Sequence, residues 1–123
     1  MKNEFIPYEQ ALALKGLGFD EPCFAWYNRR QALLSSIVYG FEEDNFLYTQ
    51  DDMDEDQYIA PLYQQAFRWF REKHGLRHFI EYDNGHYNAV VQSSLVYHCD
   101  THEEAELSCL NRLIILITPI TKP

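Results

Sequence analysis

The chain has 123 residues, of which 46% are hydrophobic and 15% aromatic, so it is too apolar and too aromatic for a disordered protein. Ten basic residues face nineteen acidic ones, and the formal net charge of −9 disfavours direct binding to nucleic acid or to an anionic membrane surface. The length predicts a single domain, residues 1–123. The acidic balance would attract a protein partner with a basic surface, and the alternative is that it only keeps a small protein in solution.

The first predicted element is a short helix over residues 8–15. Pro7 suits a helix start, because proline has no N–H to leave unpaired there, and Gly16 and Gly18 favour a helix end. Three strands are predicted next, at residues 23–28, 33–41 and 46–49, since aromatic and β-branched side chains fit a pleated sheet.

Two acidic clusters follow. The first contains Glu42, Glu43 and Asp44, and the second contains Asp51, Asp52, Asp54, Glu55 and Asp56. We interpret both as outward-facing interaction segments, because acidic side chains attract a basic partner. The alternate aspartates of the second cluster also match the start of a calcium loop. However, Gln57 stands where that loop needs glycine, and Tyr63 stands where it needs glutamate, so a solvated acidic loop is favoured.

Residues 60–75, APLYQQAFRWFREKHG, predict a complete helix. Pro61 suits its first turn, and Gly75 supplies a left-handed cap after its last turn. An apolar face follows the helical period through Leu62, Ala66, Trp69 and Phe70. The last two turns contain the cations Arg68, Arg71, Lys73 and His74. Cations stabilise the negative end of the helix dipole, so they support the predicted end of this helix.

The pair Asn84–Gly85 lies between two alternating runs and predicts a β-hairpin, because a type I′ turn needs positive φ at both positions. The expected register places Tyr82 opposite Tyr87 and Ile80 opposite Ala89. The second strand of this hairpin is expected to continue, through a bulge near residues 93–94, to residues 96–97.

Thr101 and Glu104 form a capping box that predicts the start of a last helix, which ends before Pro119. This helix is apolar on most sides, so it is either buried or self-associating, and a homodimer through it is one alternative. The predicted fold class is α+β: an antiparallel sheet of about four or five strands with three helices, in the order α-β-β-(β)-α-β-β-α.

The only dense group of metal-ligand types contains His98, Cys99, Asp100 and His102, and the candidate ligands in it are His98, Cys99 and His102. It suggests an alternative function, a small metal-binding or cysteine-dependent enzyme. Its spacing matches no known zinc pattern, and adjacent strand residues point to opposite faces, so we expect neither a catalytic residue nor a cofactor. The odd number of cysteines, three, favours reduced thiols and a cytoplasmic protein.

Three segments resemble recurring blocks of short uncharacterised proteins from bacteriophages and from mobile elements of gut Bacteroidetes. These segments are EFIPYEQALALKGLGFDEPCF (residues 4–24), APLYQQAFRWFREKHGL (60–76) and EEAELSCLNRLIILI (103–117). The resemblance implies a phage-type protein that acts inside a bacterial cell, and it implies no activity and no catalytic residue. Together with the acidic balance, it favours a non-enzymatic protein that binds or modulates a host or phage protein.

Overall fold

The computed structural model describes residues 4–35 and 47–119. The chain divides into two compact units, residues 1–64 and 65–123, and the boundary falls within helix α2 (Tyr63–His74). The single domain expected from the length of the chain stays a prediction.

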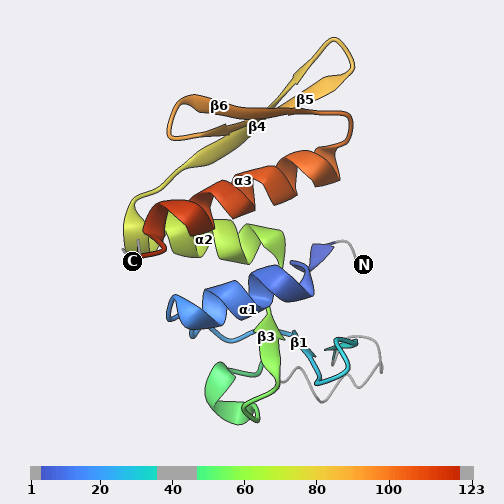
Figure 1. Cartoon of the computed structure of the whole chain (residues 1–123), viewed down its shortest axis with the longest axis vertical. Coiled ribbons are helices and arrows are strands. Elements are labelled where there is room, and N and C mark those ends of the chain that lie inside the picture. Colours follow the sequence, from blue (N-terminus) through green and yellow to red (C-terminus); the bar gives the residue numbers. More distant parts are fainter. Residues whose placement is uncertain (1–3, 36–46, 120–123) are drawn as a thin grey trace, which may run out of the picture. The chain divides into compact units, whose positions relative to one another are not determined.

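The first unit begins with α1 (Tyr8–Gly16), which is one residue longer than predicted (Figure 1). Pro7 is the residue before its first turn, as its missing N–H led us to expect. Gly18 has a φ of +91°, a backbone conformation that costs glycine little, and it turns the chain after the helix.

The first unit also contains an antiparallel sheet with the strand order β2-β1-β3. Its strands are β1 (Ala25–Tyr27), β2 (Leu33–Ser35) and β3 (Tyr58–Ala60). The rings of Tyr27 and Tyr58 lie 5.6 and 5.7 Å from the ring of Tyr8, so α1 covers the face that carries these two tyrosines. Side chains alternate along a strand, and Trp26 therefore lies on the opposite face.

One strand prediction in this unit is wrong. Of residues 46–49, Tyr48 forms only an isolated bridge with Cys23, and the third strand is β3 instead. Strand β3 was not predicted, because three residues are too few to show the alternation of apolar and polar side chains that indicates a strand. Residues 36–41 of the predicted second strand, and the first acidic cluster, lie outside the described residues.

Three residues of the predicted core face, Ala66, Trp69 and Phe70, lie in α2 and are buried. Leu62, the fourth, precedes the helix and is half-buried. Gly75, with a φ of +66°, ends it as expected. Pro61 is not in its first turn: it precedes the helix, and its carbonyl accepts a hydrogen bond of 3.0 Å from the backbone N–H of Ile6. The segment before α2 is thereby paired with the start of the chain.

The second unit contains an antiparallel sheet of β4 (His78–Asp83), β5 (His86–Val91) and β6 (Ser94–Cys99), in that order. Asn84 and Gly85 have φ values of 51° and 82°, and Tyr82 lies opposite Tyr87, which confirms the predicted turn and register.

The predicted continuation of the second hairpin strand is wrong. Gln92 and Ser93 have φ values of 52° and 68° and form another tight turn, after which β6 returns along β5. The bulge lies between Ala89 and Val90 instead. Residues other than glycine and asparagine rarely adopt a positive φ, so the residue types of Gln92 and Ser93 do not predict this turn. The α+β class and the three helices are confirmed, but residues 4–35 and 47–119 contain six strands, in two sheets of three.

Helix α3 (His102–Ile117) runs along one face of this second sheet (Figure 1). Ala105, Cys109, Leu110 and Leu113 are its buried residues, and Ile115 and Leu116 are exposed. Homodimerisation through this helix stays a prediction. Among the described helices, none combines the length and the apolar character needed to cross a bilayer.

The start of α3 tests the capping prediction. The N–H of Glu104 donates to the Thr101 hydroxyl over 3.1 Å, as predicted, but the Glu104 carboxylate accepts from the N–H of Asp100 instead of Thr101.

We expect Thr101→Ala to lower the free energy of unfolding by about 1 kcal/mol, because a helix donor loses its partner. Thr101→Ser keeps the hydroxyl and is expected to be nearly neutral in urea denaturation; equal losses in both variants would contradict the cap.

Candidate functional site

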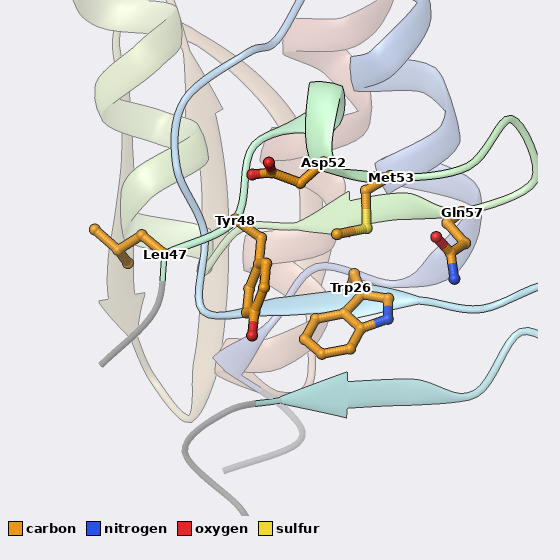
Figure 2. Close-up of a pocket in the computed structure, with 6 residues that line it drawn as sticks. All are labelled: Trp26, Leu47, Tyr48, Asp52, Met53 and Gln57. Atoms are coloured by element: carbon orange, nitrogen blue, oxygen red, sulfur yellow. The ribbon is translucent and has the colours of Figure 1, made fainter. Parts of the chain in front are cut away.

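A groove of about 430 Å³ lies in the first unit, on the side of the sheet that carries Trp26 (Figure 2). Its lining residues are Trp26, Leu47, Tyr48, Asp52, Met53 and Gln57. The rings of Trp26 and Tyr48 meet edge to face, with their centroids 4.9 Å apart. The groove therefore combines an aromatic and aliphatic surface with a single carboxylate among its lining residues.

Backbone pairing positions the Tyr48 side of the groove. Cys23 and Tyr48 exchange two backbone hydrogen bonds of 2.8 Å each, which place Tyr48 beside the segment that enters β1. Trp26 follows on β1 itself. Residues from distant parts of the sequence are thus joined by backbone hydrogen bonds, which leave the aromatic side chains available to the groove.

A short 3₁₀ turn, η2 (Gln50–Asp52), forms the opposite wall. The Asp52 carboxylate accepts from the N–H of Thr49 over 2.9 Å and from its hydroxyl over 3.3 Å, which completes a capping box. The Gln50 side chain bonds the turn to the strand region, since its amide donates to the carbonyl of Gln57 (2.7 Å) and its oxygen accepts from the N–H of Ile59 (3.2 Å). These bonds hold the wall in place.

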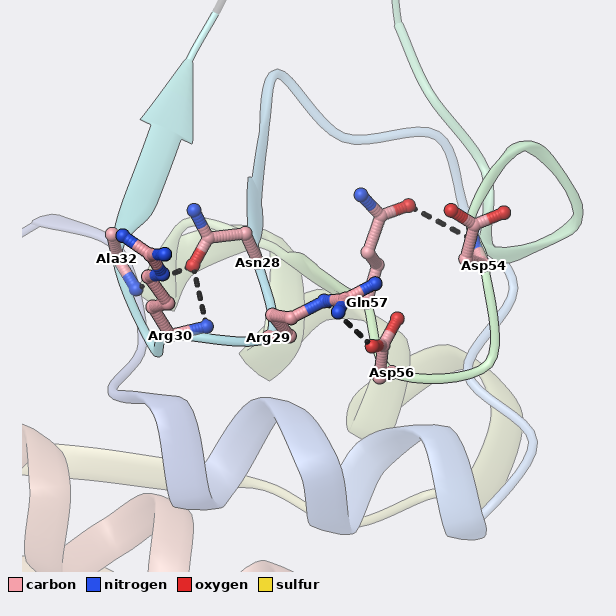
Figure 3. Close-up of polar contacts among 7 residues, drawn as sticks. All are labelled: Asn28, Arg29, Arg30, Ala32, Asp54, Asp56 and Gln57. Carbon is pink, nitrogen blue, oxygen red and sulfur yellow. Dashed lines mark hydrogen bonds and ion pairs between the residues drawn. The ribbon is translucent and has the colours of Figure 1, made fainter.

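The second acidic cluster is only partly available to a partner. Asp56 forms an ion pair of 3.2 Å with Arg29 (Figure 3). Asp52 is used in the capping box. Asp51, Asp54 and Glu55 are exposed. The Gln57 side chain accepts from the N–H of Asp54 over 2.9 Å, which closes the acidic loop on itself. Asp52 is the member of this cluster that lines the groove.

The turn between β1 and β2 carries Arg29, the basic residue of this ion pair. The Asn28 side-chain oxygen accepts from the backbone N–H of Arg30 (2.9 Å) and of Ala32 (3.0 Å) (Figure 3). These two hydrogen bonds shape the turn and place Arg29, the residue between Asn28 and Arg30, where its guanidinium reaches Asp56. The pair is exposed, so its contribution to stability is small.

The structure does not bring His98, Cys99 and His102 together. His98 contacts the Asn88 side chain, whereas the sulfur of Cys99 lies 3.7 Å from the Ser108 hydroxyl of α3. His102 contacts Glu106 and the ring of Tyr87. Within residues 4–35 and 47–119, no three His, Cys, Asp or Glu side chains form a group that could hold a metal ion.

The three cysteines are buried, and none of them forms a disulfide bond. Burial, and to a lesser degree the neighbouring Cys99 and Glu106, raise the pKa of Cys109 to about 11, and a hydrogen bond to the Val90 carbonyl opposes that shift only in part. This thiol is therefore protonated at neutral pH, and a protonated thiol is a poor nucleophile.

No protein family, no curated protein and no solved structure matched the chain. The groove residues were not all foreseen from the sequence. Trp26 belongs to the predicted strand over residues 23–28, and alternation along a strand places Trp26 and Tyr27 on opposite faces without showing which face stays open. Met53 and Leu47 carry no pattern that distinguishes them from other apolar residues.

Proposed function

We propose that this protein is a small acidic interaction protein of phage type, which binds a protein partner in the cytoplasm of a bacterial host. The groove lined by Trp26, Tyr48 and Met53 is the observation that supports the proposal, because aromatic residues and methionine are enriched at protein interfaces. The aromatic pair offers a large, stiff contact area to an apolar side chain.

Charge favours a basic segment on that partner. Residues 1–64 contain twelve acidic and four basic side chains, so the field around the groove is negative. Asp52 lines the groove, and Asp51 and Asp54 are exposed nearby in the sequence. We therefore propose a partner segment that combines a lysine or arginine with a large apolar side chain.

Selection from a displayed library of random peptides tests this proposal. We expect enriched sequences to contain a basic residue beside a large apolar one, and we expect binding to weaken as salt screens the charges. Peptides enriched without any basic residue would contradict the assigned partner chemistry. Absence of any enrichment would contradict the groove as a binding site.

The chain offers matched variants for the same assay. Leu47 lines the groove and is 49% exposed, whereas Leu12 is 44% exposed and lies on α1. We expect Leu47→Ala to weaken peptide binding about tenfold, and Leu12→Ala to leave it unchanged. Asp52→Asn and Asp51→Asn remove the same charge inside and outside the lining, and only the first should weaken binding by more than a general loss of charge.

A further inference from the structure

A second cavity, of about 260 Å³, lies entirely within the second unit. Its lining residues are Phe67, Arg71, Leu76, Arg77, His78 and Phe79. We propose that this cavity binds a small anion carried on an aromatic ring, an aryl phosphate or an aryl carboxylate. The proposal is independent of the groove in the first unit.

The cationic part of the cavity consists of Arg71, in the last turn of α2, and Arg77, just before β4. Neither guanidinium forms an ion pair or a side-chain hydrogen bond with any residue that the structure describes, although the chain has nineteen acidic residues. The lining contains no carboxylate. Two unpaired cations beside one cavity therefore create a local positive site in an acidic protein.

The backbone fixes the segment that carries Arg77. Its N–H donates to the side-chain oxygen of Gln92 over 2.8 Å, and its carbonyl accepts from the N–H of Gln92 over 2.9 Å. The side chain itself is exposed. The arginine is thus anchored at its main chain and free to orient its guanidinium, which suits a residue that closes on a ligand.

The aromatic part of the cavity is built by Phe67, His78 and Phe79. The rings of Phe67 and His78 are stacked, with centroids 3.6 Å apart and planes inclined by 23°. Phe79 is 52% exposed, so part of its ring is accessible to a ligand in the cavity. Burial, and then the positive charge of Arg71, lower the pKa of His78 to about 4, so the imidazole is neutral at neutral pH and adds an aromatic surface instead of a charge.

These features select the ligand class. A guanidinium presents its N–H donors in a planar fork, which matches the oxygens of a carboxylate or a phosphate. An exposed phenylalanine and a stacked ring pair favour a flat apolar group on the same ligand. The volume is below the usual range for drug-sized ligands, so it limits the ligand to about one ring with one anionic group.

Calorimetric titration of the whole chain tests the proposal with four probes: phenyl phosphate, benzoate, inorganic phosphate and phenol. We expect phenyl phosphate or benzoate to bind with saturation, and we expect inorganic phosphate and phenol to bind about tenfold more weakly or not at all. The better of the two aryl anions identifies the anionic group. Equal binding of inorganic phosphate, or no saturable binding of either aryl anion, would overturn the proposal.

Variants locate the site. Arg71→Gln and Arg77→Gln are each expected to weaken binding about tenfold, because each removes a charge-assisted hydrogen bond. Lys73→Gln is the matched control, since it removes the same charge from α2 at a residue outside the lining. Full binding by a variant that carries both Arg71→Gln and Arg77→Gln would overturn the assignment of the site to this cavity. In the unaltered chain, the ring signals of His78 should shift when phenyl phosphate is added, and unmoved signals would count equally against it.

Discussion

Leu113→Ala is expected to lower the free energy of unfolding by about 2–5 kcal/mol, which is the largest effect we predict for a single substitution. Leu113 is 0% exposed on the side of α3 that carries its other buried residues. Truncation to alanine removes the apolar surface that folding buries and leaves a cavity that neighbouring side chains fill only in part. Chemical denaturation at equilibrium measures the loss directly.

Leu116→Ala is the matched control, because the same atoms are removed from the same helix at a side chain that is 49% exposed. We expect a loss below about 1 kcal/mol, the difference between the two variants being the result that matters. A large loss at Leu116 that also depends on protein concentration would show that a second copy covers this side of α3. That result would contradict the assignment of this side of α3 to solvent.

Local signals in the sequence predicted the elements that one short segment can specify. Asn84–Gly85 fixed its hairpin because both residues tolerate positive φ, and the register followed from the turn. Gly75 ended α2 for the same reason. Thr101 marks the start of α3, because its hydroxyl accepts a hydrogen bond from the N–H of Glu104. In each case the determining interaction joins residues only a few positions apart.

Elements specified by distant partners were not predicted. The three-residue strand β3 is stabilised by pairing with β1, across more than thirty residues of sequence. Strand β6 depends on a turn at Gln92 and Ser93, whose residue types do not favour positive φ, and the pairing with β5 compensates for that local cost. Tertiary contact therefore outweighs local preference in both places.

The same distinction applies to the two candidate sites. Asp52 was predicted as part of an acidic segment, but its place in a groove depends on Tyr48 pairing with Cys23 and on Trp26 facing the same side. Net charge also conceals the second site, because an average over the chain does not show that residues 65–123 carry seven acidic and six basic side chains. Two of those basic residues, Arg71 and Arg77, meet at one cavity.

Stability is expected to fall as the pH is lowered from about 6.5 to about 4, in part because of His78. Its pKa is lowered from 6.5 to about 4 in the folded protein, first by burial and then by Arg71. Between these two pH values the unfolded chain binds a proton at His78 that the folded protein does not, so acid favours unfolding. The contribution is complete above pH 6.5 and is lost as the pH falls toward 4. With allowance for solvent around this half-buried ring, the loss amounts to about 2 kcal/mol.

His78→Phe isolates this contribution, because it keeps a ring against Phe67 and removes the titrating group. The difference in unfolding free energy between the unaltered chain and this variant should change by about 2 kcal/mol over that pH range. NMR titration gives the direct measurement. The ring of His78 should titrate near pH 4, and Arg71→Gln should raise that midpoint because a neighbouring cation is removed, whereas Lys73→Gln should raise it less. A midpoint near the ordinary value of 6.5 would mean that water surrounds the imidazole, and the stacked ring pair that lines the second cavity would then be wrong.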